Sequence, residues 1–313
     1  AGEGVFIMQP LYRYFVGIYH LLFGQSAFVQ HMADIWCVLG CALLIVRFAT
    51  IFRISSLFSF VAATGYLAIN LVGSFRYHIG SGLVENHAMI FMVLAAWFLC
   101  KSRQGGGHRI ILATLFGILG YWMRQDHLGA IAGLAFLASE PVEGATGGWK
   151  GYLGRFKLQW KVFAWYWGGG ISSVLLICYR NWWIGGQFHP TNSSNPIFSI
   201  SEGMQSTLIP ALNHMLLENK WPIPALSSIV LIAGTLIPLI ALVWRSKVFA
   251  EFPLSFGIIL VGLFAPYVFL WNGGYAPRFS IHLLPIVILS LTLFLSYLFK
   301  DFKFFQNFYI SRP

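Results

Sequence analysis

Residues 28–46, FVQHMADIWCVLGCALLIV, set the class of this protein. The run is about as long as a helix that crosses the hydrocarbon core of a bilayer, and Arg47 follows it directly. Backbone polar groups can be paired inside a membrane only by such regular structure, so we predict a membrane-spanning helix here. The run also holds a carboxylate, Asp34, with His31 three residues earlier on the same helical face. A polar residue in such a run predicts a buried polar contact between helices.

Similar apolar runs recur along the whole chain, which is 58% hydrophobic and only 10% charged. The run 128–138 is short, but counting it as a crossing keeps the charge pattern of the loops consistent. We therefore predict an all-α, polytopic membrane protein with about nine transmembrane helices in a single transmembrane domain, residues 1–313. The expected spans are 28–46, 57–73, 84–100, 109–123, 128–138, 161–181, 222–244, 253–271 and 279–299.

The basic residues predict the orientation of these spans. With residues 1–27 outside, 14 of the 20 basic residues fall on the inner side, as in proteins of a bacterial-type inner membrane. The net charge of +10 is spread in short clusters rather than in one patch, which argues against a nucleic-acid partner and for the lipid bilayer. The inner residues are Arg47, Arg53, Lys101, Arg103, Arg109, Lys150, Arg155, Lys157, Lys161, Arg245, Lys247, Lys300, Lys303 and Arg312.

Two outer segments are not expected to span. Residues 11–23 carry an apolar stripe and are too short to cross, so we predict a helix lying in the interface. Residues 182–221 are rich in Gly, Pro, Asn and Ser, and we predict an outer loop that covers a site. The chain opens on Ala1 with no leader, and we expect it to lack an N-terminal span and part of the first outer loop.

Polar groups collect on the predicted outer face. Five arginines lie there against the positive-inside pattern, and such cations call for a carboxylate, a lipid headgroup or a phosphate. In YWMRQDHLG (121–129), Arg124 and Asp126 either pair with each other, or Asp126 and His127 face a cavity where Arg124 holds an anion. Glu85 opens a span, where it either stabilises the helix dipole or belongs to a site. The five arginines are Arg13, Arg76, Arg124, Arg180 and Arg278.

Several signatures of soluble enzymes are absent from the sequence. There is no Walker loop, H-E-x-x-H, G-x-S-x-G or glycine-rich dinucleotide fingerprint. The four cysteines lie in apolar stretches without the Cys/His spacing of a metal site.

Both ends of the chain resemble one enzyme family. GEGVFIMQPLYRYFVGIYHLLFG (2–24) and YAPRFSIHLLP (275–285) are similar to the interfacial helix and to a late span of polyprenyl-phosphate-dependent glycosyltransferases with the GT-C fold. The resemblance implies a membrane glycosyltransferase that moves a sugar from a polyprenyl-phosphate carrier to an extracytoplasmic acceptor. A divalent metal is a possible cofactor.

The resemblance also implies roles for particular residues. Arg278, Tyr275, Arg13 and Arg124 are the expected donor phosphate ligands. The catalytic carboxylate is expected at Asp126 or Glu3, and the further cavity candidates are Glu85, His127 and His282.

Two other functions fit the same topology. A transporter or lipid flippase should line both halves of a pathway with polar residues, whereas here the polar residues favour one face. A non-catalytic subunit of a membrane complex would use the fold for assembly alone.

Overall fold

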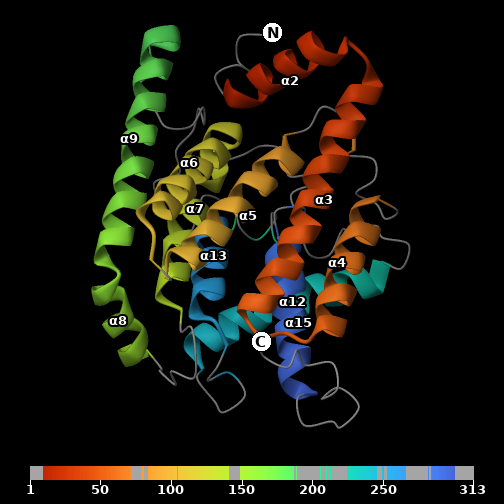
Figure 1. Ribbon diagram of the computed structural model, residues 1–313, viewed down its shortest axis with the longest axis vertical. Coiled ribbons are helices and arrows are strands. Elements are labelled where there is room, and N and C mark those ends of the chain that lie inside the picture. The colour runs from red at the N-terminus through yellow and green to blue at the C-terminus, as the bar shows by residue number, and fades with distance from the viewer. Residues whose placement is uncertain are drawn as a thin grey trace.

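The protein is built from helices (Figure 1). The computed structural model describes residues 10–71, 79–80, 84–103, 105–140, 149–186, 224–244, 252–265 and 283–299, and residues 188, 205, 209, 212, 249 and 281. Within these residues all regular structure is helical and no strand occurs, which confirms the predicted all-α class for this part of the chain.

In the described part of the chain, two helices are long and apolar enough to cross a membrane, judged by length and composition alone. They are α3 (Ala27–Ile51) and α9 (Trp160–Gly185), and both run along the long axis of the molecule (Figure 1). Ser26 caps α3 by accepting a hydrogen bond from the backbone N–H of Val29. Gly186 ends α9 in the left-handed conformation, with φ of 70°, which glycine adopts without strain.

The other predicted spans also coincide with helices, but these are shorter than α3 and α9. Helix length therefore does not confirm that the chain has nine membrane-spanning helices. These helices are α4 (Ser56–Leu71), α5 (Glu85–Ser102), α6 (Gly107–Met123), α7 (Leu128–Leu134) with η3 (Ala135–Ser139), α12 (Pro224–Val243), α13 (Leu254–Phe264) and α15 (Leu284–Leu298). Two further short elements are η2 (Gln125–His127) and α8 (Trp149–Leu158).

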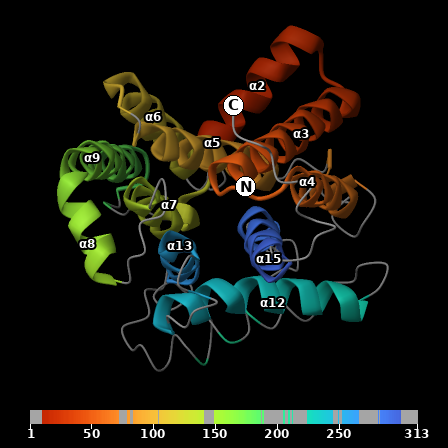
Figure 2. The same cartoon turned by 60° about the horizontal axis from the view of Figure 1, so that its bottom comes forward.

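Helix α12 differs in direction from the two longest helices. It runs crosswise to α3 and α9 in Figure 1, and the turned view in Figure 2 shows it lying across α13 and α15, which it contacts. Glycines allow these close crossings: a Cβ at Gly234 would overlap Val287 of α15, and one at Gly257 of α13 would press on the carbonyl of Pro238. That 222–244 crosses a membrane alongside the other runs stays a prediction.

Helix α2 (Pro10–Phe23) lies across one end of the molecule, over the ends of α3, α5 and α6 (Figure 1). Its inner face packs Tyr12, with Leu11, Phe15 and Val16, against Ala88 and Met123. Its opposite face leaves Tyr14, Ile18 and Leu21 exposed, at the i, i+4, i+7 spacing of one helical face. An apolar outer face on a 14-residue helix is the form expected of a helix in a membrane interface.

Candidate functional site

Buried polar side chains gather at the end of the molecule covered by α2. They come from α2, from the first turns of α3, from the start of α5 and from the junction of α6 with η2 and α7. We call this group the α2-end cluster; it consists of Tyr12, Gln30, Asp34, Glu85, Asn86, His87, Arg124, Gln125 and His127, each less than 9% exposed. Burying so many polar groups is costly unless they contact one another, so their pairing defines the site.

Arg124 and Glu85 form the strongest contact of the cluster. The Nη1 of Arg124 donates to Oε1 of Glu85 at 2.6 Å, and both side chains are at most 9% exposed. Glu85 is the first residue of α5, where the helix dipole favours a negative charge. Arg124 ends α6 in an extended backbone conformation, which turns its side chain back toward α5. The described partner of Arg124 is thus Glu85. The predicted pairing of Arg124 with Asp126 stays a prediction, because the side chain of Asp126 lies outside the described residues.

Asp34 forms a second polar centre with His87. Its Oδ1 lies 3.3 Å from Nδ1 of His87, and its Oδ2 accepts a hydrogen bond from the backbone N–H of Gly80 at 2.8 Å. Gly80 has a φ of 74°, and a Cβ there would overlap the ring of His31, so the turn that donates to Asp34 requires glycine. His31 is exposed, and its Nδ1 contacts the carbonyl of Ala27 instead.

Helix α2 closes over this centre with two tyrosines. The ring of Tyr12 meets His87 edge-on with centroids 5.4 Å apart, and Tyr19 lies 5.9 Å from the same ring. The Tyr12 hydroxyl also accepts a hydrogen bond from Gln30 at 2.9 Å. Burial, reinforced by Asp34, raises the pKa of Tyr12, and burial raises the pKa of Tyr19 to about 12. Both phenols therefore stay protonated at neutral pH and keep a hydrogen to donate.

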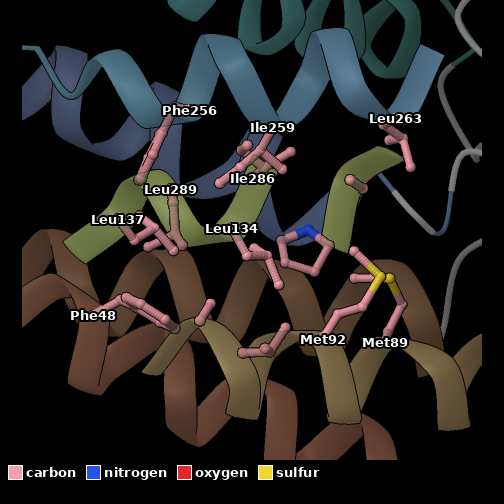
Figure 3. Close-up of a pocket in the computed structure, with 14 residues that line it drawn as sticks. Phe48, Met89, Met92, Leu134, Leu137, Phe256, Ile259, Leu263, Ile286 and Leu289 are labelled. Carbon is pink, nitrogen blue, oxygen red and sulfur yellow. The ribbon is translucent and has the colours of Figure 1, made fainter. Parts of the chain in front are cut away.

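An apolar cavity of about 70 Å³ lies one helical turn inward from Glu85. Figure 3 shows Met89 and Met92 of α5 pointing into it, opposite Leu134 of α7 and Ile259 of α13. Residues of α3 and α15 close it on the remaining sides. Its lining is wholly apolar, and its volume is well below the ~300 Å³ of the smallest usual ligand pockets.

The residues predicted from sequence divide into three groups. Arg124, Glu85 and His127 are buried in the α2-end cluster, and none of them lines the two described cavities. Arg13 lies on the exposed face of α2. Asp126 belongs to η2 but its side chain lies outside the described residues, as do Glu3, Tyr275, Arg278, His282 and most of the loop 182–221.

The Asp34–His87 contact was missed as a pair. The sequence indicated a buried polar contact for Asp34, but only its same-face neighbour His31 was considered. The available signal was His87 itself, which stands two residues after Glu85 in an otherwise apolar span. Among the described residues, no group of three or more His, Cys, Asp or Glu side chains is arranged to hold a metal ion.

Comparison of the chain with known protein families, with curated proteins and with solved structures finds no match.

Proposed function

We propose that this protein is a polytopic membrane glycosyltransferase of the GT-C type, which moves a sugar from a polyprenyl-phosphate carrier to an acceptor outside the cytoplasm. The observation that carries the proposal is the α2-end cluster. Buried charges are concentrated at one end of an otherwise apolar helical protein, beneath a helix with the form of an interfacial one. Ionisable groups in such surroundings are by default candidates for a functional site. The proposed location is the bacterial inner membrane, with this end facing away from the cytoplasm.

The proposed reaction needs two kinds of group. The bond between the sugar C1 and the phosphate oxygen breaks, a new bond forms from C1 to the acceptor oxygen, and the acceptor proton passes to a carboxylate. Asp126 is the proposed carboxylate near this end, with Glu3 as the other candidate. The departing phosphate needs a permanent cation with bidentate geometry, which guanidinium provides.

The proposed phosphate ligands are Arg278, Tyr275, Arg124 and Arg13. Arg278 and Tyr275 come shortly before α15 in the sequence and lie outside the described residues. Arg124 is held by Glu85 at 2.6 Å, which fixes the position of its guanidinium inside the cluster. Arg13, on the exposed face of α2, is the remaining candidate.

A transporter is the main competing function. The cavity directly inward from Glu85 is lined by apolar side chains alone, so it offers no polar path through the molecule for a charged substrate. This favours chemistry at one end over passage between the two ends.

Binding of the carrier tests the proposal. We would reconstitute the protein in lipid nanodiscs and label it with a photoreactive polyprenyl phosphate, with the polyprenol of the same chain length as the matched control. We expect saturable labelling that excess unlabelled polyprenyl phosphate suppresses and polyprenol does not, because the phosphate carries the recognition. Equal labelling by the two lipids, or no saturable labelling, would refute the proposal.

A further inference from the structure

A groove of about 420 Å³ lies between α6, α7 and α9, on the side of the molecule away from α12 and α15. Its α9 wall includes Gly170, where a Cβ would meet nothing within 4 Å, and Ile171 and Leu175 are exposed beside it. The volume falls within the usual ~300–1,000 Å³ of ligand sites.

The polar groups of this groove are already paired within the protein. Tyr166 donates to the carbonyl of Ile131 at 3.1 Å, and Trp167 donates to the carbonyl of Ala132 at 3.0 Å. The hydroxyl of Ser173 accepts a hydrogen bond from Trp122 at 2.6 Å, and that of Thr114 donates to the carbonyl of Ile110 at 2.9 Å. Tyr121 is the fifth lining residue with a polar side-chain atom, and the rest of the groove is apolar side chain and glycine. The groove therefore presents mainly a hydrocarbon surface.

The tryptophans of α9 place the groove at hydrocarbon depth. Trp160 and Trp165 are exposed near the start of the helix, and Trp182 and Trp183 near its end. From Trp160 to Trp182 the helix rises about 33 Å, close to the thickness of a bilayer core. Indole rings favour the two membrane interfaces, so the groove between them faces acyl chains.

A cation lies further along α9, beyond Leu175, the last residue of α9 that lines the groove. Arg180 is half-buried and lies seven residues after Ser173, on the same face of α9 and about 10 Å further along it. Its Nη1 lies 3.3 Å from the amide oxygen of Asn181, to which it donates. An apolar groove at hydrocarbon depth with a guanidinium at interface depth is complementary to a lipid with an anionic headgroup.

We propose that this groove binds an anionic phospholipid of the bilayer, with an acyl chain against Gly170 and the phosphate at Arg180. The site is separate from the α2-end cluster and its occupancy does not depend on sugar transfer.

Two glycines of α9 provide a matched test. Gly170 lines the groove, whereas Gly168 is exposed, and a Cβ at either position meets no atom within 4 Å. Gly170→Leu should fill the groove and Gly168→Leu should leave it open. We would reconstitute each variant in equal amounts of phosphatidylglycerol and phosphatidylcholine, transfer it to mild detergent, and count retained lipids by native mass spectrometry.

We expect the wild type and Gly168→Leu to retain phosphatidylglycerol, and Gly170→Leu to retain about tenfold less, because the leucine displaces methylene groups of the chain. Arg180→Gln should lower the ratio of phosphatidylglycerol to phosphatidylcholine by about fivefold. Equal melting temperatures of the two leucine variants would show that both fold.

Three results would overturn the assignment. The first is that Gly170→Leu retains as much phosphatidylglycerol as Gly168→Leu. The second is an unchanged ratio of phosphatidylglycerol to phosphatidylcholine in Arg180→Gln. The third is that equimolar polyprenyl phosphate displaces phosphatidylglycerol from the wild type but not from Gly170→Leu. Photolabelling of the same variants by polyprenyl phosphate separates this site from the proposed function. If polyprenyl phosphate does not label the wild type saturably, the glycosyltransferase proposal is refuted, whereas the result for phospholipid binding is unaffected.

Discussion

Arg124 and Glu85 show at the scale of single residues why buried charges must be considered as pairs. Each side chain is at most 9% exposed, and the two are joined at 2.6 Å. Taking either charge out of water is expensive, and only the partner offsets that cost. The pair therefore holds the junction of α6 with η2 against the first turn of α5.

Loss of one partner should destabilise the protein strongly. We expect Arg124→Gln to lower the free energy of unfolding by about 3–5 kcal/mol, because it leaves Glu85 as a buried uncompensated charge. The double variant Glu85→Gln with Arg124→Gln should lose less than the sum of the two single variants. Denaturant unfolding in mixed micelles measures these differences. The control Arg13→Gln, at an exposed position, should change the free energy by less than about 0.5 kcal/mol. Additive effects of the two single replacements would contradict a direct pair.

The site residues were only partly predictable from sequence. Arg124, Glu85 and His127 were identifiable because ionisable groups stand out at the ends of apolar runs. Their partners were not, because pairing depends on which helices lie side by side. Asp34 and His87 are 53 residues apart in the chain, and only the packing of α3 against α5 brings them together.

At the scale of elements, glycines set how closely the helices approach. Helices α7 and α13 cross with Gly129 against Gly262, and a Cβ at either position would overlap the other residue's carbonyl oxygen. Such backbone contact is common between helices in membranes, where small residues replace the hydrophobic effect as the basis of packing.

Substitution at this crossing should separate the two helices. We expect Gly262→Ala to cost about 1–3 kcal/mol, since the neighbouring backbone has to shift. Gly65→Ala in α4 is the matched control, because a Cβ there meets nothing within 4 Å and alanine is the better helix former. Melting temperatures in detergent compare the two variants. A Gly262→Ala protein as stable as the Gly65→Ala protein would show that the crossing is looser than described.

Glu140 joins three elements at the end of the molecule opposite α2. Its Oε1 accepts a hydrogen bond from the backbone N–H of Ser255, in the first turn of α13, at 2.6 Å. Arg103 donates to its backbone carbonyl, and Arg155 donates to the carbonyl of Ser139, both at 2.8 Å. Burial raises the pKa of Glu140 above its ordinary value of 4.5, against the opposing effect of the hydrogen bond from Ser255.

The raised pKa predicts the direction of a pH effect on stability. An acid whose pKa is higher in the folded than in the unfolded state contributes stability that is complete below the unfolded value, here 4.5, and is lost as pH rises through the folded value. Glu140→Gln keeps an acceptor oxygen and cannot ionise. We therefore expect the melting temperature of the wild type to fall relative to that of Glu140→Gln as pH is raised from about 4 to about 8. A difference that stays constant over this range would contradict the raised pKa.

For the whole molecule, the sequence predicted the helices better than their orientations. Every predicted span overlaps a helix because apolar runs of this kind have few alternatives to helix. Helix α12 is the example: its apolar run predicts a span, but not the direction in which it crosses α13 and α15 (Figure 2). Nothing in an apolar pattern specifies crossing direction, which depends on where glycines such as Gly234 allow close contact.

The two ends of the molecule provide a test of membrane orientation. The charge pattern places residues 182–221 outside and 139–160 inside. Single cysteines at Ser193 and Thr146 should therefore differ, with an impermeant maleimide added to intact cells labelling the first and sparing the second. Of the four native cysteines, Cys41, Cys100 and Cys178 are buried and Cys37 is partly exposed, so Cys37→Ser lowers the background. Labelling of Thr146→Cys alone would reverse the proposed sidedness.

The central claim is that sugar leaves a polyprenyl-phosphate carrier at this protein, and sugar transfer in proteoliposomes tests it most directly. We would supply carriers labelled in hexosyl or pentosyl groups and measure the sugar released from the carrier to an acceptor. The account predicts transfer by the wild type. In Arg278→Ala the rate should be lower by about 10²-fold or more, because the departing phosphate loses its cation. Arg278→Lys should have an intermediate rate, because it keeps the charge without the bidentate geometry. No release from any carrier, while the labelled lipid moves across the bilayer, would contradict the account and identify a flippase instead.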